Sequence, residues 1–379
     1  MRSTNLINLA QEIQNKLSDN IGPDYMEFGG SLIGKLLLNE ELNYINGVNS
    51  TSNSSFNDLI DLVVNSNFSE DLRFWYGPAG TYWGLTCITL NTMHSLTLSK
   101  RIKELDELIL SRLNTIDMPG LVDGIAGLLI YAIKRNQILN NDILSAALIE
   151  RAIEIFRSAQ MSNCIRNPPK KNIDSRVRHD LGVDLGLAHG YPALIAIFAD
   201  CLSKYPQNDK LREALQESLV WLKSHELPQS NISRYPFFQN EIISSRLGWC
   251  YGDLSVAIAF CKGGRILDDK ISLSWGRKLF DDIVFCGEQR IRNNEHCLCH
   301  GYSGVMRAIK FAEEVLTDFS SSGSYALLCT KTTDACRKFL DGHISVSEDN
   351  LLEGYSGTAL GLLNTVAVSR TGWHKAFAM

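Results

Sequence analysis

A short glycine-containing turn recurs seven times along the 379-residue chain, each time just before a run of apolar residues. The turns follow a loose Gly-x-x-Gly pattern, and successive copies start about 46 to 66 residues apart. Their positions are Ser31–Gly34, Gly77–Gly80, Gly124–Gly127, Gly190–Ala193, Gly252–Ser255, Gly301–Gly304 and Gly354–Gly357. A repeat of this length holds two helices and two loops, and such units bury their apolar faces by stacking on one another. The chain is therefore restricted to a repeat architecture.

The repeats contain two kinds of helical stretch. The residues that follow the turns, such as 256–260, are small or apolar on all sides, which is typical of helices buried by several neighbours. The stretches between the turns, such as 143–159 and 211–225, have apolar residues at helical spacing and charges on the opposite face. These patterns predict an all-α fold, an α/α toroid of seven inner and seven outer helices with all turns at one end. We expect residues 1–379 to form this single domain.

The glycine turns and two polar segments predict further features of the fold. Glycine permits positive φ and close backbone approach, so the clustered turns can form a floor that a substrate touches. Helix capping is the other interpretation of any single copy. Residues 163–180 are polar and basic with a proline pair, and they predict a long surface loop or small insertion. Residues 49–58 predict a second loop.

The composition narrows the class of partner. The net charge is −5, and no long run of Lys or Arg is present, so the chain lacks the electrostatic footprint of a protein that binds nucleic acid or anionic lipid. The N-terminal residues lack a signal-peptide core, and no stretch reaches eighteen uninterrupted apolar residues. We therefore predict a cytoplasmic protein without membrane insertion. In that compartment the ten cysteines are better interpreted as buried residues, ligands or nucleophiles than as disulfides.

Three of the turns add reactive side chains to the glycine pattern. LGLAHG contains His189, RLGWCYGD contains Cys250, and CLCHG contains Cys299 and His300. If the turns converge, Cys250, Cys299 and His300 supply two thiolates and one imidazole. This set matches a catalytic zinc site with an open fourth position. Taken alone, Cys250 beside Trp249 fits a small buried core residue better than a ligand. Cys297 is a rival ligand, but Cys299 lies two residues before its turn, as Cys250 does.

A family resemblance rests on four motifs. GLAHG, WCYGD, CHGYSG and LEGYSG occur in this order over essentially the whole chain. In this combination the chain resembles the lanthionine synthetase C-like family, which includes the cyclases of class I lanthipeptides. The resemblance implies a sevenfold α/α toroid with one zinc ion on the three ligands described above. It also implies that His189, Arg246 and Tyr251 line the active site.

The chain departs from that family at one acidic position. The family has an active-site aspartate four residues before the first glycine of the third turn, and here that residue is Gly120. Asp117 or Asp123 could reach the same space. We take Asp123 as the candidate catalytic carboxylate, with an exposed or helix-capping carboxylate as the alternative interpretation.

The reaction implied is conjugate addition of a peptide cysteine thiol to dehydroalanine or dehydrobutyrine, which forms a lanthionine or methyllanthionine thioether. A free thiol has a pKa of about 8.5, and coordination to zinc would deprotonate it. Arg246 would stabilise the enolate that develops, and His189 would protonate the α-carbon, after first accepting the thiol proton. Tyr251 would hydrogen-bond the enolate oxygen or form an aromatic wall of the pocket.

Two other functions remain open on the same fold. One is a zinc-containing peptide- or glutathione-binding toroid without cyclase activity. The other is a zinc-dependent thiol alkyltransferase similar to the prenyltransferase α/α barrels, although those use an Asp, Cys and His set. The cyclase hypothesis predicts a dehydrated precursor peptide with its leader as substrate, with a dehydratase or transporter complex as a further partner. Because all three functions are compatible with zinc, turnover separates them.

Overall fold

The computed structural model describes residues 2–17, 27–48, 61, 63–65, 70–89, 95–161, 182–227, 233–290, 295–342 and 350–379. Within these ranges the regular structure is helical, with two isolated β-bridges and no strand. The loops predicted at 49–58 and 163–180 lie outside the described residues.

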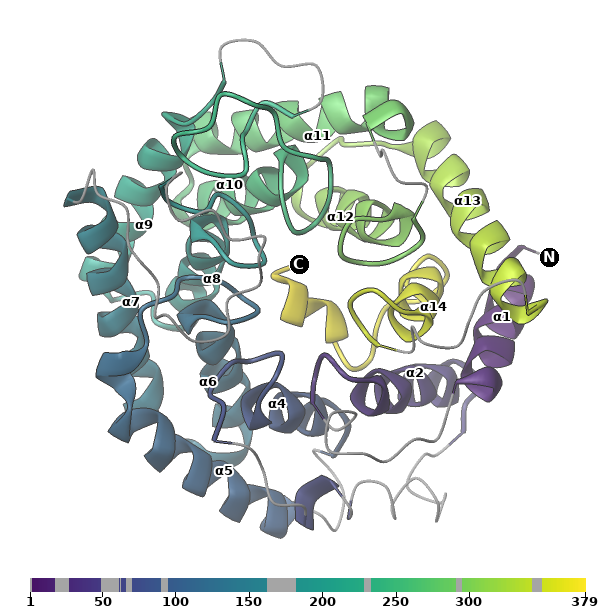
Figure 1. The fold of residues 1–379 in the computed structure, drawn as a ribbon, viewed down its shortest axis with the longest axis horizontal. Helices are drawn as coiled ribbons and strands as arrows, with labels where there is room; N and C mark the ends of the chain where they lie inside the picture. The colour runs from purple at the N-terminus through teal and green to yellow at the C-terminus, as the bar shows by residue number, and fades with distance from the viewer. Residues whose placement is uncertain are drawn as a thin grey trace.

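Seven helices in the described ranges form an inner ring around a common axis (Figure 1). Each begins directly after the capping glycine of a recurring turn, so the last three residues of the Gly-x-x-Gly pattern lie in the helix. Each packs with apolar residues on most sides. The last of them is buried along its entire length. They are α2 (Ser31–Ile45), α4 (Pro78–Thr89), α6 (Ile125–Leu139), α8 (Tyr191–Lys204), α10 (Asp253–Leu267), α12 (Tyr302–Val315) and α14 (Tyr355–Leu363).

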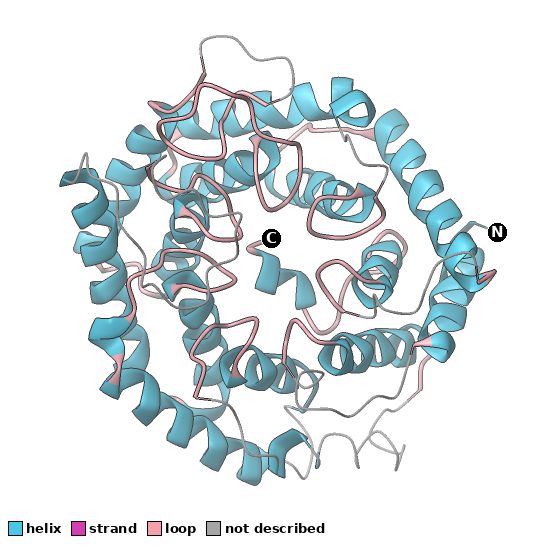
Figure 2. Ribbon diagram, viewed as in Figure 1, coloured by secondary structure: helices cyan, strands magenta, loops and turns pink. Residues whose placement is uncertain are grey.

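Longer amphipathic helices surround this ring, and the loops that precede the inner helices gather over one end of it (Figure 2). The outer helices are α1 (Arg2–Lys16), α5 (Ser95–Ser111), α7 (Ile143–Met161), α9 (Asp209–Lys223), α11 (Lys270–Arg290) and α13 (Ser322–Leu340). Between α2 and α4 the described residues 61 and 63–65 are also helical. None of the helices in the described ranges is both long and apolar enough to cross a membrane. The predicted all-helical toroid is therefore confirmed.

The glycines of the turns are required by close contact between backbone segments. A Cβ atom at Gly77 would lie 2.0 Å from the carbonyl oxygen of Asp71, and one at Gly304 would lie 2.0 Å from that of Leu298. Among the glycines of the described turns, only Gly252 has the expected positive φ, at 87°. The first copy also begins one residue earlier than predicted, because Gly30 caps α2.

The C-terminal segment occupies the centre of the ring, where the short 3-10 helix η4 (Trp373–Phe377) lies (Figure 1). Glu41 of α2 anchors it, because one carboxylate oxygen accepts hydrogen bonds from the hydroxyl of Ser369 at 2.6 Å and the N–H of Thr371 at 2.9 Å. These charge-assisted bonds fix the segment to the inner ring.

An aromatic cluster connects this central segment to the turns. The ring centroid of Phe377 lies 5.3 Å from Trp75 and 5.1 Å from Trp249. The indole N–H of Trp249 also donates to the carbonyl oxygen of Phe377 at 2.9 Å. Because Trp249 precedes Cys250, the cluster supports the turn that carries this cysteine.

Replacing Phe377 by Ala is expected to lower the free energy of unfolding by about 3–5 kcal/mol, since the change removes a fully buried ring. Urea denaturation followed by circular dichroism measures this loss. The matched control is Phe285→Ala, where the side chain is 90% exposed and the expected change is within about 0.5 kcal/mol. Equal stability of the two variants would contradict the supporting role of the central segment.

Candidate metal centre and active site

A series of backbone hydrogen bonds joins consecutive turns at one equivalent position, two residues before each capping glycine. Each N–H donates to the carbonyl oxygen of the equivalent residue in the next turn. The pairs are Trp75 to Val122 at 3.2 Å, Val122 to Ala188 at 2.8 Å, Ala188 to Cys250 at 3.5 Å, Cys250 to Cys299 at 3.1 Å and Cys299 to Leu352 at 3.0 Å. Residues at the same offset therefore become neighbours, which explains why the two cysteines meet.

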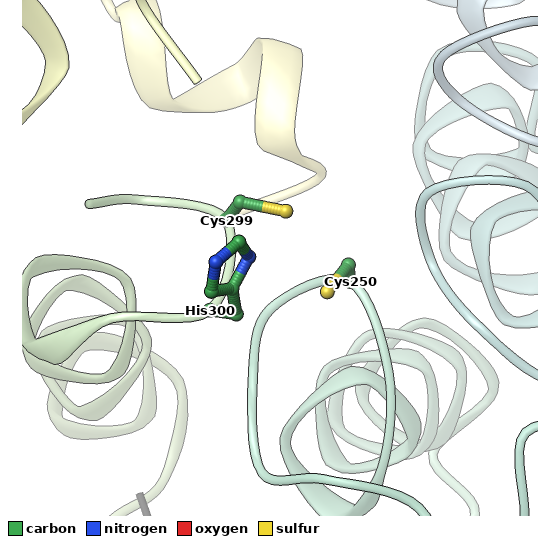
Figure 3. Close-up of side chains that lie close together, drawn as sticks. All are labelled: Cys250, Cys299 and His300. Carbon is green, nitrogen blue, oxygen red and sulfur yellow. The ribbon is translucent and has the colours of Figure 1, made fainter. Parts of the chain in front are cut away.

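Cys250, Cys299 and His300 converge as predicted (Figure 3). Their ligand atoms all lie within 4.8 Å of one another, and both cysteines are buried. One nitrogen of the His300 ring faces the sulfur atoms (Figure 3). Nδ1 of this ring is buried and has no hydrogen-bond partner among the described residues, which is costly unless a ligand binds it. Two sulfurs and one imidazole are donors typical of zinc sites, so the cluster could bind a metal ion.

The groups around the cluster favour a thiolate at Cys250 but not at Cys299. The thiol of Cys299 donates a hydrogen bond to Cys250, and this bond lowers the pKa of Cys250 well below its ordinary value. His300 adds to this effect, as does Arg246, whose Nη2 atom lies 3.3 Å from the Cys250 sulfur. The same shared proton raises the pKa of Cys299. Binding of a cation would displace this proton, because thiolates are the metal ligands.

A second pair of groups consists of His189 and Asp123. Nδ1 of His189 lies 2.9 Å from Oδ2 of Asp123, and the two side chains are 39% and 23% exposed. Burial lowers the pKa of His189, but the hydrogen bond to Asp123 and the charges of Asp123, Asp184 and Cys250 outweigh it and raise the pKa to about 9. The imidazole is therefore protonated at neutral pH.

The position of Asp123 bears on the missing family aspartate. A Cβ atom at Gly120 would lie 2.4 Å from the Cα atom of His189, so no side chain fits there without a backbone shift. Asp117, the other candidate, is exposed. The N-cap of helix α6 is Gly124, and of the Asp123 carboxylate oxygens Oδ2 contacts His189 while Oδ1 has no hydrogen-bond partner among the described residues, so Asp123 does not act as the capping carboxylate. Of the two candidates, Asp123 is the one that contacts His189.

Asp184 is a residue of this region that the sequence analysis missed. Its Oδ2 atom accepts the hydroxyl proton of Tyr251 at 2.7 Å, and its Oδ1 atom accepts the N–H of Gly186 at 2.8 Å. Burial raises the pKa of Asp184 to about 6, although His189 and Tyr251 lower it. The carboxylate thus links two neighbouring turns. The available signal was an acidic residue five positions before the histidine in DLGLAHG.

Two roles are predicted for Tyr251, and its contacts bear on both. Its ring contacts Phe237 with a centroid distance of 5.0 Å, as expected of an aromatic wall. Its hydroxyl proton is already donated to Asp184, so donation to a substrate oxygen would require that bond to break.

Comparison with known proteins decides the family. The family model described as "Lanthionine synthetase C-like protein" matches residues 35–378. The chain belongs to the lanthionine synthetase C-like family. It is similar to the "Nisin biosynthesis protein NisC" of Lactococcus lactis subsp. lactis, with 21% identity over 279 residues. This alignment covers 68% of the chain but 63% of the relative, which is less than two thirds of its length.

A solved structure of a "Nisin cyclase" has the same fold as this lanthionine synthetase C-like protein. The TM-score is 0.74 at 17% sequence identity, and the match covers 100% of this chain and 96% of that chain. At this identity the likeness shows a common toroid, and the activity must be argued from the site.

Replacing Asp123 by Asn should lower the pKa of His189 by about 1–3 pH units, because the variant loses an opposite charge at hydrogen-bond distance. The pKa is read from the pH dependence of the His189 ring signals in NMR spectra. The exposed Asp117→Asn is the control and should leave the titration near pH 9. An unchanged titration in Asp123→Asn would show that this carboxylate does not hold the imidazolium.

Proposed function

We propose that this lanthionine synthetase C-like protein is a zinc-dependent cyclase that adds peptide cysteine thiols to dehydroalanine or dehydrobutyrine and so forms thioether rings. The observation that carries the proposal is the buried cluster of Cys250, Cys299 and His300 with an unpartnered imidazole nitrogen. Family membership and the likeness to NisC support the same reaction.

In this proposal, Cys250, Cys299 and His300 hold one zinc ion. Three protein ligands are typical of catalytic zinc sites, which keep one position open for substrate. When bound, zinc lowers the pKa of a coordinated thiol, so that the substrate sulfur is a thiolate at neutral pH.

The residues around the cluster supply charge stabilisation and a proton. The guanidinium of Arg246 lies against Cys250 and stays protonated at any physiological pH, so it stabilises the negative charge that develops on the acceptor amide. His189 donates the proton that the α-carbon requires, and Asp123 orients the ring and stabilises its charge. Because its pKa is about 9, His189 is a better donor than acceptor at neutral pH. It is therefore poorly suited to accept the thiol proton first; that proton leaves to solvent, and His189 regains a proton from solvent after each addition.

The competing functions receive less support. A protein that merely binds peptide or glutathione needs the metal ligands but has no use for the protonated His189 beside Asp123. A thiol alkyltransferase is not favoured by the family match. Three further points stay predictions: a precursor peptide with its leader as substrate, a complex with a dehydratase or transporter, and cytoplasmic localisation.

Protein purified without chelators is expected to contain about one zinc ion per chain, as measured by mass spectrometry of the metal. Cys299→Ala should lose the metal with little change in the circular dichroism spectrum, because one of three ligands is gone. Cys201→Ala is the matched control, since Cys201 is also fully buried but lies outside the cluster. Metal-free wild-type protein would contradict the proposal.

Incubation with a dehydrated peptide that contains a free cysteine should remove the thiol without changing the peptide mass, which alkylation and mass spectrometry detect. His189→Ala should keep zinc but cyclise about 10²–10⁴-fold more slowly, since it lacks the proton donor. The wild-type rate should fall as the pH rises through about 9, where His189 loses its proton. An unimpaired rate in His189→Ala would remove this residue from the mechanism.

A further inference from the structure

The imidazole of His300 contacts a carboxylate through its second ring nitrogen. Nε2 of His300 forms an ion-pair contact with Oε2 of Glu295, whereas Nδ1 is buried without a partner among the described residues. A carboxylate is an acceptor, so the nitrogen that it contacts carries the ring proton. In the neutral imidazole the lone pair then lies on Nδ1. Glu295 thus selects the nitrogen that remains available to a metal.

The repeat fixes Glu295 in this place. A backbone carbonyl group six residues earlier packs closely on five of the capping glycines, so that a Cβ atom on the glycine would lie 2.5 Å or less from the carbonyl oxygen. These glycines are Gly77, Gly124, Gly190, Gly252 and Gly301. In three successive turns the residues at this position are Asp184, Arg246 and Glu295. The first two reach Tyr251 and Cys250, respectively. Glu295 is therefore the third member of a set of side chains that the fold directs to the site.

The backbone of Glu295 is held as firmly as its side chain. Its carbonyl oxygen accepts the N–H of Tyr302, the first residue of α12, at 2.9 Å. The loop from Glu295 to His300 is therefore closed at the start of the same helix. The carboxylate is 39% exposed and the imidazole 13% exposed, so the pair lies at the edge of the buried cluster.

A second set of donors shares His300. The ligand atoms of Glu295, Cys297 and His300 also lie within 4.8 Å of one another, and Cys297 is buried. In this set Glu295 contacts Nε2 of His300, so a metal bound here would take Nε2 as its imidazole ligand. The contact of Glu295 with Nε2 instead gives this nitrogen a proton and makes the carboxylate an outer partner of the histidine.

We propose that Glu295 is a positioning residue, which keeps the proton of His300 on Nε2 and so presents Nδ1 to the metal. The inference rests on the metal site of the proposed function and extends it by one residue. A carboxylate behind a ligating histidine fixes the tautomer and ring orientation, and its loss typically weakens metal binding by about 10–100-fold.

The test measures metal affinity without any peptide substrate. Co²⁺ is titrated into metal-free protein, with thiolate-to-cobalt absorption as the signal, and Zn²⁺ affinity follows from competition with a chelator. Glu295→Ala should bind both ions about 10–100-fold more weakly than wild type. The affinity of Glu295→Gln should lie between those of Glu295→Ala and wild type, because the amide oxygen still accepts the hydrogen bond. Glu107→Ala, an exposed glutamate away from the cluster, should bind as wild type does.

A second readout follows the proton directly. ¹⁵N NMR spectra of the zinc-loaded protein should show His300 protonated on Nε2 and free of a proton on Nδ1. Wild-type affinity in Glu295→Ala would overturn the positioning role but leave the proposed function intact. The positioning role would also be overturned if wild-type protein bound two metal ions and Cys297→Ser bound only one. Glu295 would then be a metal ligand itself. A wild-type protein that binds neither ion would contradict the proposed function too.

Discussion

The structure depends on the backbone hydrogen bond that each turn donates to the next. Because this bond repeats at one offset from the capping glycine, residues far apart in the chain become neighbours at the same end of the toroid. The polar residues of the site come from three offsets. Two residues before the glycine are Cys250 and Cys299; directly before it are Asp123, His189, Tyr251 and His300; six residues before it are Asp184, Arg246 and Glu295.

This arrangement separates the charges of the site into two neighbouring groups. Around the candidate metal ligands, Arg246 contacts the Cys250 sulfur and Glu295 contacts Nε2 of His300. In the preceding turns, Asp123 holds the protonated His189. In the proposed function, thiol activation and proton delivery therefore belong to different turns. Asp123 and Glu295 each contact one histidine, whereas Asp184 contacts Tyr251.

The centre of the toroid packs against the turns that carry this site. Phe377 packs between Trp75 and Trp249, and Glu41 anchors the segment that leads to it. The residue that follows Trp249 is Cys250, so the packing of the aromatic cluster limits the movement of a candidate metal ligand. A site held within fractions of an ångström needs such support, since loops alone leave ligands too mobile.

Helix positions, the toroid and the meeting of Cys250 with Cys299 follow from the sequence, because apolar periodicity and the offset from a glycine are local patterns that a repeat copies around the ring. The sequence favoured Asp123 but left Asp117 as an alternative, and it did not indicate Asp184 or Glu295 as site residues. Their roles depend on contacts between turns, such as the backbone of His189 that fills the space beside Gly120. Only the closed ring decides which side chains those contacts bring together.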